Sequence, residues 1–600
     1  MRTLLLRKIA GLILITCCSL AAPGQPAARE VGGAPAVRAA ARSTAIAQKP
    51  AITVPPNRFA KDAEWWKRAV FYEIYPRSYA DTDNDGVGDL KGITQHLDHL
   101  QALGVDAIWI TPCFPSPQVD FGYDVSDYRD IDPQYGTLAD MDRLIAEAEK
   151  RNIKIILDFV MNHSSDQHKW FQESKKSRDN PYRDYYVWRD GQGPGQPPTN
   201  WISLFGGSGW TYEARTDQWY HHFFYPQQPD LNWRNPKVEQ EMFDVVRYWF
   251  KKGVYGFRLD AVDTLFEDPA FRDNPNDPGK NAYGDPNQRH VMDSKLPEVH
   301  TQLQGLRRVV DEFHGRVLVG ETWTNKAEEL ADYYGPKNNE VHMPMYFNLT
   351  VINRLSPAAF REKIRVIESN PVGGWPVYVL SNHDIRRHID RYGDGQNNDK
   401  IARVMAALYL TLRGTAVLYY GEEIAMENND PKRKEDVKDV IGQRGWPQEK
   451  GRDGERTPMQ WNASANAGFN DGATPWLPVH ENYKTKNVET QTSDPKSMLN
   501  WYRQLITLRR SHPAFYEGAY VPLLEDSDSV LAYARKSKDK TGVVLLNMTA
   551  SPQKVSFSPT QLGGSSAKPL LRTSDAKDID LRNVTLEPFG VVIAEAGSAR

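Results

Sequence analysis

The stretch "IKIILDFV" (residues 153–160) is a short apolar run, and it directly follows "LADMDRLIAEAEKRN" (138–152), whose apolar residues have helical spacing. A strand that is buried on both faces of a sheet forms a nearly continuous apolar run of this kind. A helix followed by a buried strand is part of the unit that joins parallel strands. The number of times this pair recurs therefore decides the fold.

Similar apolar runs occur elsewhere in the chain, separated by longer stretches that suit helices. They are "AVFYEIYP" (69–76), "VDAIWITP" (105–112), "VYGFRLDAV" (254–262), "RVLVGET" (316–322), "MPMYFN" (343–348), "PVYVLSNHD" (376–384) and "TAVLYYGEE" (415–423). Strands that alternate with helices predict a parallel sheet, and eight of them fit a closed (β/α)₈ TIM barrel. A doubly wound open sheet is the alternative, although it more often ends near five or six strands.

The remaining segments predict two further parts beside the barrel. About seventy residues rich in Gly, Pro, Tyr and Trp follow the third strand, too many for a loop, so we expect an inserted domain B at 161–232. The barrel, domain A, then comprises 61–160 and 233–515. The tail has several β-patterned runs, including "TGVVLLNMT" (541–549), and predicts a C-terminal antiparallel β-sandwich, domain C, at 516–600.

The N-terminus has the pattern of an export signal. A basic start precedes the apolar segment "IAGLILITCCSLAA" (9–22), so we expect a signal peptide at 1–22 and a periplasmic or secreted protein. Residues 23–60 are rich in Ala and Pro and predict a flexible leader. Cys17 and Cys18 raise the alternative of a lipid anchor, but the residues before them fit a lipobox poorly. The apolar segment is too short for a membrane span.

The composition gives no reason to expect nucleic acid or an anionic membrane as a partner. Lys and Arg number 74 and Asp and Glu 77, a formal net charge of −3. The expected partner is a small molecule, and the oligomeric state stays open. Removal of the signal leaves Cys113 as the only thiol, so no internal disulfide is expected.

Polar residues gather at the ends of the predicted strands, where barrels of this kind build their active sites. They are Asp158, Asn162 and His163 after the third strand, Arg258 and Asp260 at the fourth, Glu321 at the fifth, and Asn382, His383 and Asp384 at the seventh. A single acid at such a place is often an ion-pair partner, but several strands that each deliver one suggest cleavage of a glycosidic bond. That reaction needs a proton donor and a second carboxylate across the sugar carbon.

The sequence around Asp260 and Glu321 suggests which acid is the nucleophile and which is the proton donor. Arg258 lies two residues before Asp260 on the same strand, so both side chains point to one face. Its charge is expected to keep Asp260 ionised, which suits a nucleophile. Glu321 follows the apolar "VLVG" and is the better candidate for the protonated acid.

The motifs "DFVMNH", "GFRLDAV", "GETW" and "SNHD", in this order and spacing, together resemble glycoside hydrolase family 13, the α-amylase family. "QPDLNW" (228–233) and "RTPMQW" (456–461) make the chain most similar to the oligo-1,6-glucosidase and α-glucosidase branch. The resemblance extends from about Trp65 to Arg600. It implies the same barrel, inserted domain and β-sandwich as the residue pattern.

The resemblance also implies residue roles. Asp260 matches the nucleophile that forms a covalent glucosyl intermediate, Glu321 the general acid/base, and Asp384 the transition-state stabiliser. His163, His383 and Arg258 match groups that hold the sugar in the −1 subsite or orient the nucleophile. We expect retention of anomeric configuration, with the Asp260 and Glu321 carboxyls about 5–5.5 Å apart.

The loop "DTDNDGVGDL" (81–90) carries acids at alternate positions, as an EF-hand does. The twelfth position, however, is Gly92 and not the required bidentate Glu, so the alternatives from the residues alone are another hard-cation site or a solvated acidic turn. The family resemblance implies a structural Ca²⁺, with Mg²⁺ as the alternative ion. Its implied ligands are the side chains of Asp81, Asp83, Asp85 and Asp89 and the carbonyl of Val87.

For substrate choice, the resemblance implies that Asp120 pairs with Arg456 to cap the pocket around a terminal glucose, while Tyr123 stacks beneath it. A bidentate arginine–carboxylate pair is geometrically fixed, so it predicts release of one glucose at a time. Ala261 stands where Val goes with α-1,6 preference, and "EDPAFRDNP" (267–275) resembles relatives that are selective for short α-1,4 substrates. These features favour α-1,4 linkages.

Other activities of the same family remain as alternatives. An oligo-1,6-glucosidase, a sucrose isomerase or a transglucosylase would use the same covalent intermediate. The segment "IRRHIDRYGDG" (385–395) is arginine-rich but lacks the expected isomerase pattern. A non-enzymatic subunit of an amino-acid transporter is disfavoured, because all three acids are present and no membrane span follows the signal.

Overall fold

The structure is a computed structural model, and it describes residues 61–597 apart from 325, 371–372, 563–565 and 575–578. The predicted signal peptide and leader lie outside the described residues. Within the described part of the chain, every helix is too short or too polar to cross a bilayer.

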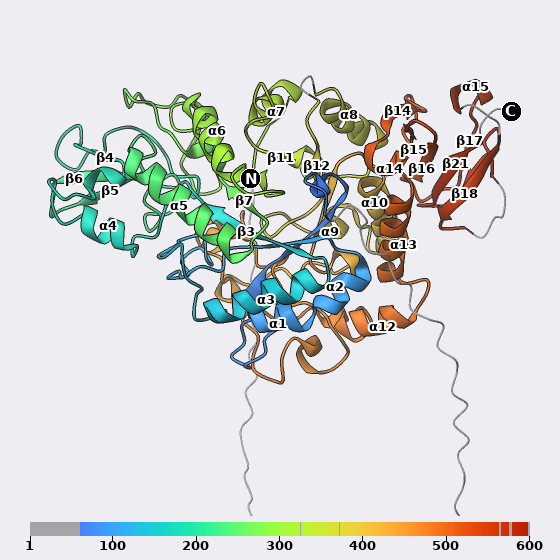
Figure 1. Ribbon diagram of the computed structural model, residues 1–600, viewed down its shortest axis with the longest axis horizontal. Coiled ribbons are helices and arrows are strands. Elements are labelled where there is room, and N and C mark those ends of the chain that lie inside the picture. The colour runs from blue at the N-terminus through green and yellow to red at the C-terminus, as the bar shows by residue number, and fades with distance from the viewer. Residues whose placement is uncertain (1–60, 325, 371–372, 563–565, 575–578, 598–600) are drawn as a thin grey trace, which may run out of the picture. The chain divides into compact units, whose positions relative to one another are not determined.

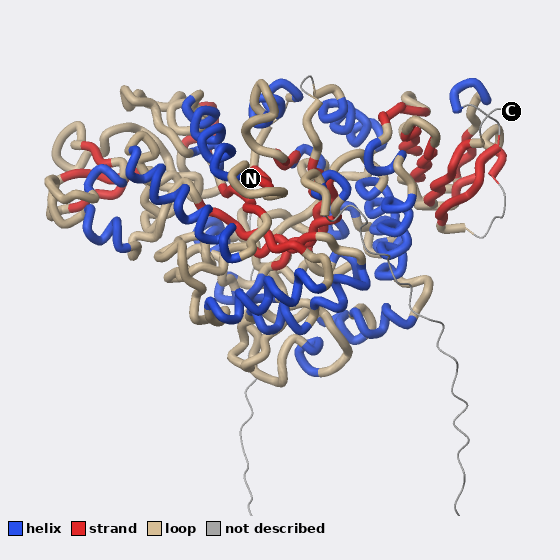
Figure 2. Tube along the Cα trace, in the orientation of Figure 1, coloured by secondary structure: helices blue, strands red, loops and turns tan. Residues whose placement is uncertain are grey.

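Eight parallel strands close into a barrel in the order β1-β2-β3-β7-β10-β11-β12-β13, so the predicted TIM barrel is confirmed. Figure 2 shows these strands with helices around them. Their bounds are β1 (Val70–Ile74), β2 (Ala107–Ile110), β3 (Lys154–Val160), β7 (Gly256–Asp260), β10 (Val317–Gly320), β11 (Met343–Tyr346), β12 (Val377–Val379) and β13 (Thr415–Tyr419). All their residues are buried, because the barrel interior packs one face of each strand and the helices cover the other.

Amphipathic helices follow or precede these strands. The longer ones are α3 (Leu138–Lys150), α5 (Pro236–Lys252), α6 (Glu298–Val310), α8 (Pro357–Glu368), α10 (Asn398–Leu410) and α13 (Met498–Ser511). The shorter ones are α1 (Leu90–Gln95), α2 (Leu97–Leu103), α7 (Ala327–Tyr334), α9 (His388–Tyr392), α11 (Val440–Gly445), α12 (Val488–Ser493) and α14 (Ala514–Glu517). Helix α3 shows why the sequence forms them. It begins at a reciprocal capping box between Thr137 and Asp140, and its buried face includes Met141 and Leu144.

The segment between β3 and α5 forms a small layer of its own. It contains α4 (Lys169–Ser174) and a three-stranded antiparallel sheet of β4 (Trp188–Arg189), β6 (Gln218–His221) and β5 (Trp210–Glu213). Val187, Trp201 and Trp210 form its core. A hairpin that the sequence did not predict, β8 (Asn276–Lys280) with β9 (Pro286–Gln288), extends from the loop after β7.

The C-terminal part is antiparallel. Its larger sheet has the order β14 (Ala519–Leu523), β15 (Val530–Lys536), β16 (Thr541–Asn547), β21 (Val591–Ala596), β18 (Ser566–Arg572) and β19 (Ile579–Asp580). A second sheet pairs β17 (Gln553–Val555) with β20 (Val584–Leu586), and a short helix, α15 (Pro559–Leu562), lies between β17 and β18 in the chain. The larger sheet lies beside the barrel helices (Figure 1). Its strand β15 contacts α8, and Arg535 Nη1 lies 2.6 Å from Glu368 Oε1.

Candidate active site

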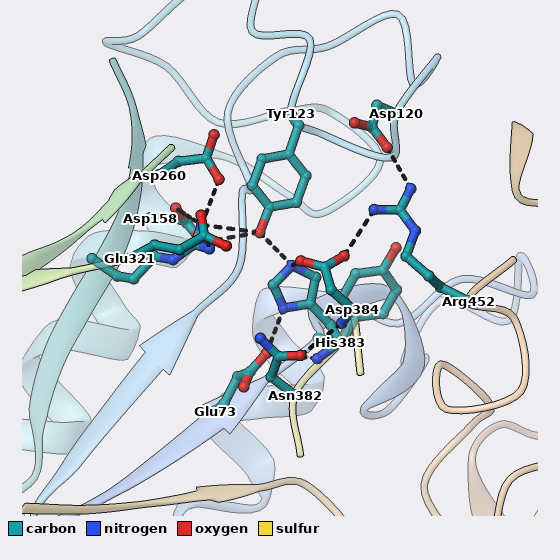
Figure 3. A network of polar contacts seen from close by, with 12 residues as sticks. Glu73, Asp120, Tyr123, Asp158, Asp260, Glu321, Asn382, His383, Asp384 and Arg452 are labelled. Carbon is teal, nitrogen blue, oxygen red and sulfur yellow. Dashed lines mark hydrogen bonds and ion pairs between the residues drawn. The ribbon is translucent and has the colours of Figure 1, made fainter. Parts of the chain in front are cut away.

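One cavity of about 840 Å³ collects the three acids that the sequence places at strand ends. Asp260, Glu321 and Asp384 all line it, and so do Asp120 and Tyr123. Asp260 ends β7, Glu321 directly follows β10, and Asp384 lies in the loop after β12. The barrel therefore brings together acids that are far apart in the chain, at the edge where its strands end (Figure 3).

Arg258 is the shared partner of three carboxylates, of which Asp158 and Asp260 are buried. Its Nη1 lies 2.9 Å from Asp158 Oδ1 and 2.7 Å from Asp260 Oδ1, and its Nη2 lies 2.7 Å from Glu321 Oε2. Asp260 and Glu321 thus contact adjacent nitrogens of one guanidinium, which places both acids beside the same small volume. One positive charge facing three carboxylates favours retention of a proton within the cluster.

This cluster shows that Arg258 does not act on Asp260 alone, since the same guanidinium faces two further acids. Burial raises the pKa of Asp260 above its usual range, and the nearby carboxylates of Glu321 and Asp158 add to that rise. The guanidinium of Arg258 opposes the rise but is divided among three acids. The ionisation of Asp260 is therefore set by the cluster as a whole.

Ala261 connects the two principal acids through its backbone. It has φ 47° and ψ 42°, a left-handed conformation that is uncommon outside glycine and asparagine. Its N–H donates a hydrogen bond of 3.0 Å to Glu321 Oε2. A β-branched residue would fit this conformation less well, so the backbone favours Ala at this position.

His383 is held between two carboxylates, as Figure 3 shows. Its Nδ1 lies 2.6 Å from Glu73 Oε1, and its Nε2 lies 3.0 Å from Asp384 Oδ2. Burial alone would lower the pKa of His383, but the two acids raise it to about 9. Burial alone would raise the pKa of Asp384, but the charges of His383 and Arg452 hold it well below its usual range. Asp384 is therefore ionised beside an imidazolium.

Glu73 is a residue that the sequence reasoning missed. It lies within β1 and is completely buried, with one oxygen on His383 and the other, Oε2, lacking a hydrogen-bond partner. Its position in the middle of an apolar strand run could have indicated a functional or paired acid, because buried acids are rare unless paired.

Asp120 pairs with Arg452 and not with Arg456, which corrects the predicted pocket cap. Arg452 Nη2 lies 2.8 Å from Asp120 Oδ1, and Nη1 of the same side chain lies 2.8 Å from Asp384 Oδ1 (Figure 3). Arg456 instead forms an ion pair of 2.8 Å with Asp384 and donates a hydrogen bond of 2.7 Å to the carbonyl oxygen of His383. Arg452 therefore joins Asp120 directly to Asp384.

Tyr123 and His163 also line the cavity. The Tyr123 ring stacks on His383 with centroids 5.5 Å apart, and its hydroxyl lies 3.2 Å from Asp158 Oδ2. His163 Nε2 lies 3.2 Å from the Tyr123 carbonyl oxygen, and burial lowers its pKa to about 3, so its ring is neutral. Both rings are fixed by protein contacts beside the acids.

The acidic loop before α1 forms a compact cluster. Carboxylate oxygens of Asp81, Asp83 and Asp89 lie within 4.8 Å of one another. Slight burial raises the pKa of Asp83, and the charges of Asp85, Asp89 and Asp81 add to the rise. Carboxylates this close repel one another. A hard cation with oxygen ligands would relieve that repulsion, so these three residues fit such an ion.

Asp85, another predicted ligand, is not part of this cluster. Its Oδ1 accepts a hydrogen bond of 2.8 Å from the Val87 N–H. The loop itself is pinned to the segment 469–476, where Asn470 Nδ2 donates to Asp81 Oδ2 at 2.9 Å.

Comparison with known proteins matches this geometry to a family. The family model described as the catalytic domain of α-amylase matches residues 73–518, and that of the C-terminal domain of maltogenic amylase matches residues 521–593. The chain belongs to the α-amylase family. The family is glycoside hydrolase family 13, and its predicted membership and enzymatic class, a glycoside hydrolase, are thereby confirmed.

Relatives within the α-amylase family have several specificities. A probable α-glucosidase of Rhizobium meliloti (strain 1021) is 42% identical over 81% of this chain and 90% of its own length. The oligo-1,6-glucosidase of Parageobacillus thermoglucosidasius is 40% identical over 81% and 90%. The crystal structure of the trehalulose synthase MutB from Pseudomonas mesoacidophila MX-45 superposes with a TM-score of 0.82 at 36% identity, over 89% and 99%.

Proposed function

We propose that this protein is a retaining, exo-acting α-glucosidase that releases terminal glucose from short α-glucosides, with α-1,4 linkages favoured. The observation that carries the proposal is the Arg452 bridge. It ties Asp120 to Asp384 across one side of the cavity that holds Asp260 and Glu321. A fixed ion pair beside the sugar site leaves room for a chain end and opposes a chain that continues past it.

The side chains support double displacement. Glu321 donates a proton to the glycosidic oxygen while Asp260 attacks the anomeric carbon, so the bond to the leaving sugar breaks as the bond to Asp260 forms. Glu321, now a carboxylate, removes a proton from water, which attacks the same carbon and releases Asp260. Asp384, ionised beside His383, grips the sugar hydroxyls and stabilises positive charge on the ring in the transition state.

The linkage preference rests on Ala261, whose methyl side chain lines the cavity beside both acids. The relatives named oligo-1,6-glucosidase and trehalulose synthase keep α-1,6 hydrolysis and sucrose isomerisation as the alternatives. A sucrose complex is known for a variant of the trehalulose synthase MutB.

Product analysis after incubation with maltose, isomaltose, sucrose, trehalose and starch tests the function. We expect α-glucose as the first product, with maltose cleaved faster than isomaltose and starch attacked slowly from its ends. Rapid shortening of starch from within would contradict an exo enzyme. Conversion of sucrose to an isomeric disaccharide, without net hydrolysis, would favour the isomerase.

We also propose that the acidic loop holds a structural Ca²⁺ between Asp81, Asp83 and Asp89. Chelation with EDTA is then expected to lower Tm, since three clustered carboxylates lose their counter-charge, and added Ca²⁺ is expected to restore it. Differential scanning calorimetry measures both. Asp83→Asn removes one ligand and should abolish the response to EDTA, whereas Asp127→Asn, which changes an acid outside the loop, should keep it. An unchanged Tm of the wild type in EDTA would count against the ion.

A further inference from the structure

A buried cluster outside the catalytic cavity joins the inserted domain to a loop of the barrel. His221 ends β6 and Asp230 follows it in the inserted domain, whereas Glu267 belongs to the loop after β7. All three side chains are buried, and one ring nitrogen and one oxygen from each acid lie within 4.8 Å of one another. The lining of the cavity that holds Asp260 and Glu321 includes none of the three, so the proposed hydrolysis does not use them.

The contacts of His221 fix which of its ring nitrogens carries the hydrogen. Nδ1 lies 3.0 Å from the carbonyl oxygen of Gly209, and a carbonyl can only accept, so Nδ1 is the donor. Burial lowers the pKa of His221 well below its usual range, so Nε2 of the neutral ring keeps a lone pair. Metal-binding histidines have this arrangement, with one N–H on a backbone carbonyl and the other nitrogen on the ion. The rings of Trp201 and Trp210, with centroids 5.1 and 5.0 Å from that of the imidazole, form an apolar shell around it.

The lone pair of Nε2 shares its surroundings with further acceptors. Asp230 Oδ2 lies 3.8 Å away, too far for a hydrogen bond, and within the described part of the chain Nε2 has no hydrogen-bond partner. Glu267 Oε1 also lacks one among the described residues. Asp230 Oδ1 accepts from Asn162 Nδ2 at 3.0 Å, and both its oxygens accept from the Phe223 N–H at 3.2 Å, so Oδ2 keeps lone-pair capacity. Buried acceptors that face one another cost free energy unless a positive charge lies between them.

The charges around this point favour a cation. Burial raises the pKa of Asp230 well above its usual range, and the charges of Glu267 and Asp293 add to that rise. Burial also raises the pKa of Glu267, to about 7, although Arg234 opposes it with Nη1 at 3.6 Å from Glu267 Oε2. A divalent ion at the centre of the cluster would replace the protons that these acids otherwise retain.

We propose that His221 Nε2, Asp230 Oδ2 and Glu267 Oε1 bind a divalent transition-metal ion, with Zn²⁺ the ion that suits one imidazole and two carboxylates. The ion is structural, because it ties β6 of the inserted domain to the loop after β7. It uses none of the residues of the acidic loop at 81–90, whose clustered oxygens suit Ca²⁺. The inference is independent of the proposed hydrolysis.

The test adds Co²⁺ or Zn²⁺ alone to protein that has been stripped of metal with a chelator and then freed of the chelator. The visible absorption of bound Co²⁺ reports nitrogen and oxygen ligation, and calorimetry gives the stoichiometry and affinity of Zn²⁺. His221→Leu removes the nitrogen ligand, and Glu267→Gln removes a charged oxygen ligand at nearly unchanged shape. His314→Leu changes an exposed histidine and is the matched control, while Asp83→Asn controls for the acidic loop. The thermal midpoint without metal reports whether each variant has folded.

We expect the wild type, His314→Leu and Asp83→Asn to bind one equivalent of Zn²⁺ with a rise in Tm, and Co²⁺ to give a visible band. His221→Leu and Glu267→Gln should each lower the affinity by about 100-fold or more and abolish the rise in Tm. If His221→Leu fails to fold, Glu267→Gln decides the question. Absence of a Co²⁺ band in the wild type, or a band that persists in Glu267→Gln or disappears in His314→Leu, would overturn the inference. Release of glucose from maltose, measured separately, decides the α-glucosidase function whatever the metal result.

Discussion

Asp260→Asn is expected to reduce kcat for p-nitrophenyl α-glucoside by a factor on the order of 10⁴ or more, because a neutral amide cannot form the glucosyl ester. The same change removes one of the three carboxylates that face Arg258. Like-charge repulsion within the buried cluster falls, so the free energy of unfolding should stay equal or rise. Loss of activity with an unchanged or higher Tm separates a nucleophile from a structural ion-pair partner.

Chemical rescue gives this prediction a sharper readout. Asp260→Gly leaves space where the carboxylate stood, and azide can then attack the anomeric carbon from that side. We expect azide to restore turnover and to yield the β-configured glucosyl azide, identified by NMR. The control is Asp158→Asn, since Asp158 contacts the same guanidinium but lies outside the cavity lining. Its activity should show no rescue, and an α-configured azide from Asp260→Gly would contradict the assignment.

The barrel could be predicted because each of its strands is buried on both faces. Such a strand is a nearly continuous apolar run, which can be recognised from the sequence alone. The sites of Asp260, Glu321 and Asp384 followed from the same pattern, since the ends of parallel strands share one edge. The polar residues that follow "GFRL", "VLVG" and "PVYVL" could therefore be predicted to lie close together.

Arg452 and Glu73 show where this reasoning stops. Arg452 lies in a long charged loop without periodicity, so its partners depend on how the loop returns over the barrel. Arg456, in the recognisable "RTPMQW", was the more visible choice, yet its guanidinium is committed to His383 and Asp384. Glu73 sits inside an apolar strand run, and its role became apparent only when β1 was placed beside the loop after β12. The exposed hairpin of β8 and β9 buries no apolar pattern that could have predicted it.

Arg452→Met tests the corrected pocket cap and is expected to be the most destabilising of the proposed substitutions. Its guanidinium contacts the carboxylates of Asp120, Asp384 and Asp439, each at 2.8 Å, and removing it leaves these acids without their shared counter-charge. Breaking a buried ion pair from one side costs about 3–5 kcal/mol, so the unfolding free energy in urea should fall by about that amount. We expect kcat/KM for maltose to fall by roughly 10²-fold or more, since the end of the sugar site loses its fixed geometry.

The pH profile identifies which acid loses its partner. Arg452 helps to hold the pKa of Asp384 below its usual range, so its removal should raise that pKa and move the acid limb of kcat/KM to higher pH. Arg386→Met is the matched control, because Arg386 lines the same cavity but pairs with Asp430. Its profile should coincide with that of the wild type. If Arg456→Met weakened maltose binding while Arg452→Met left it unchanged, the pairing of Asp120 with Arg452 would not be what closes the pocket, and the basis for an exo-acting enzyme would be lost.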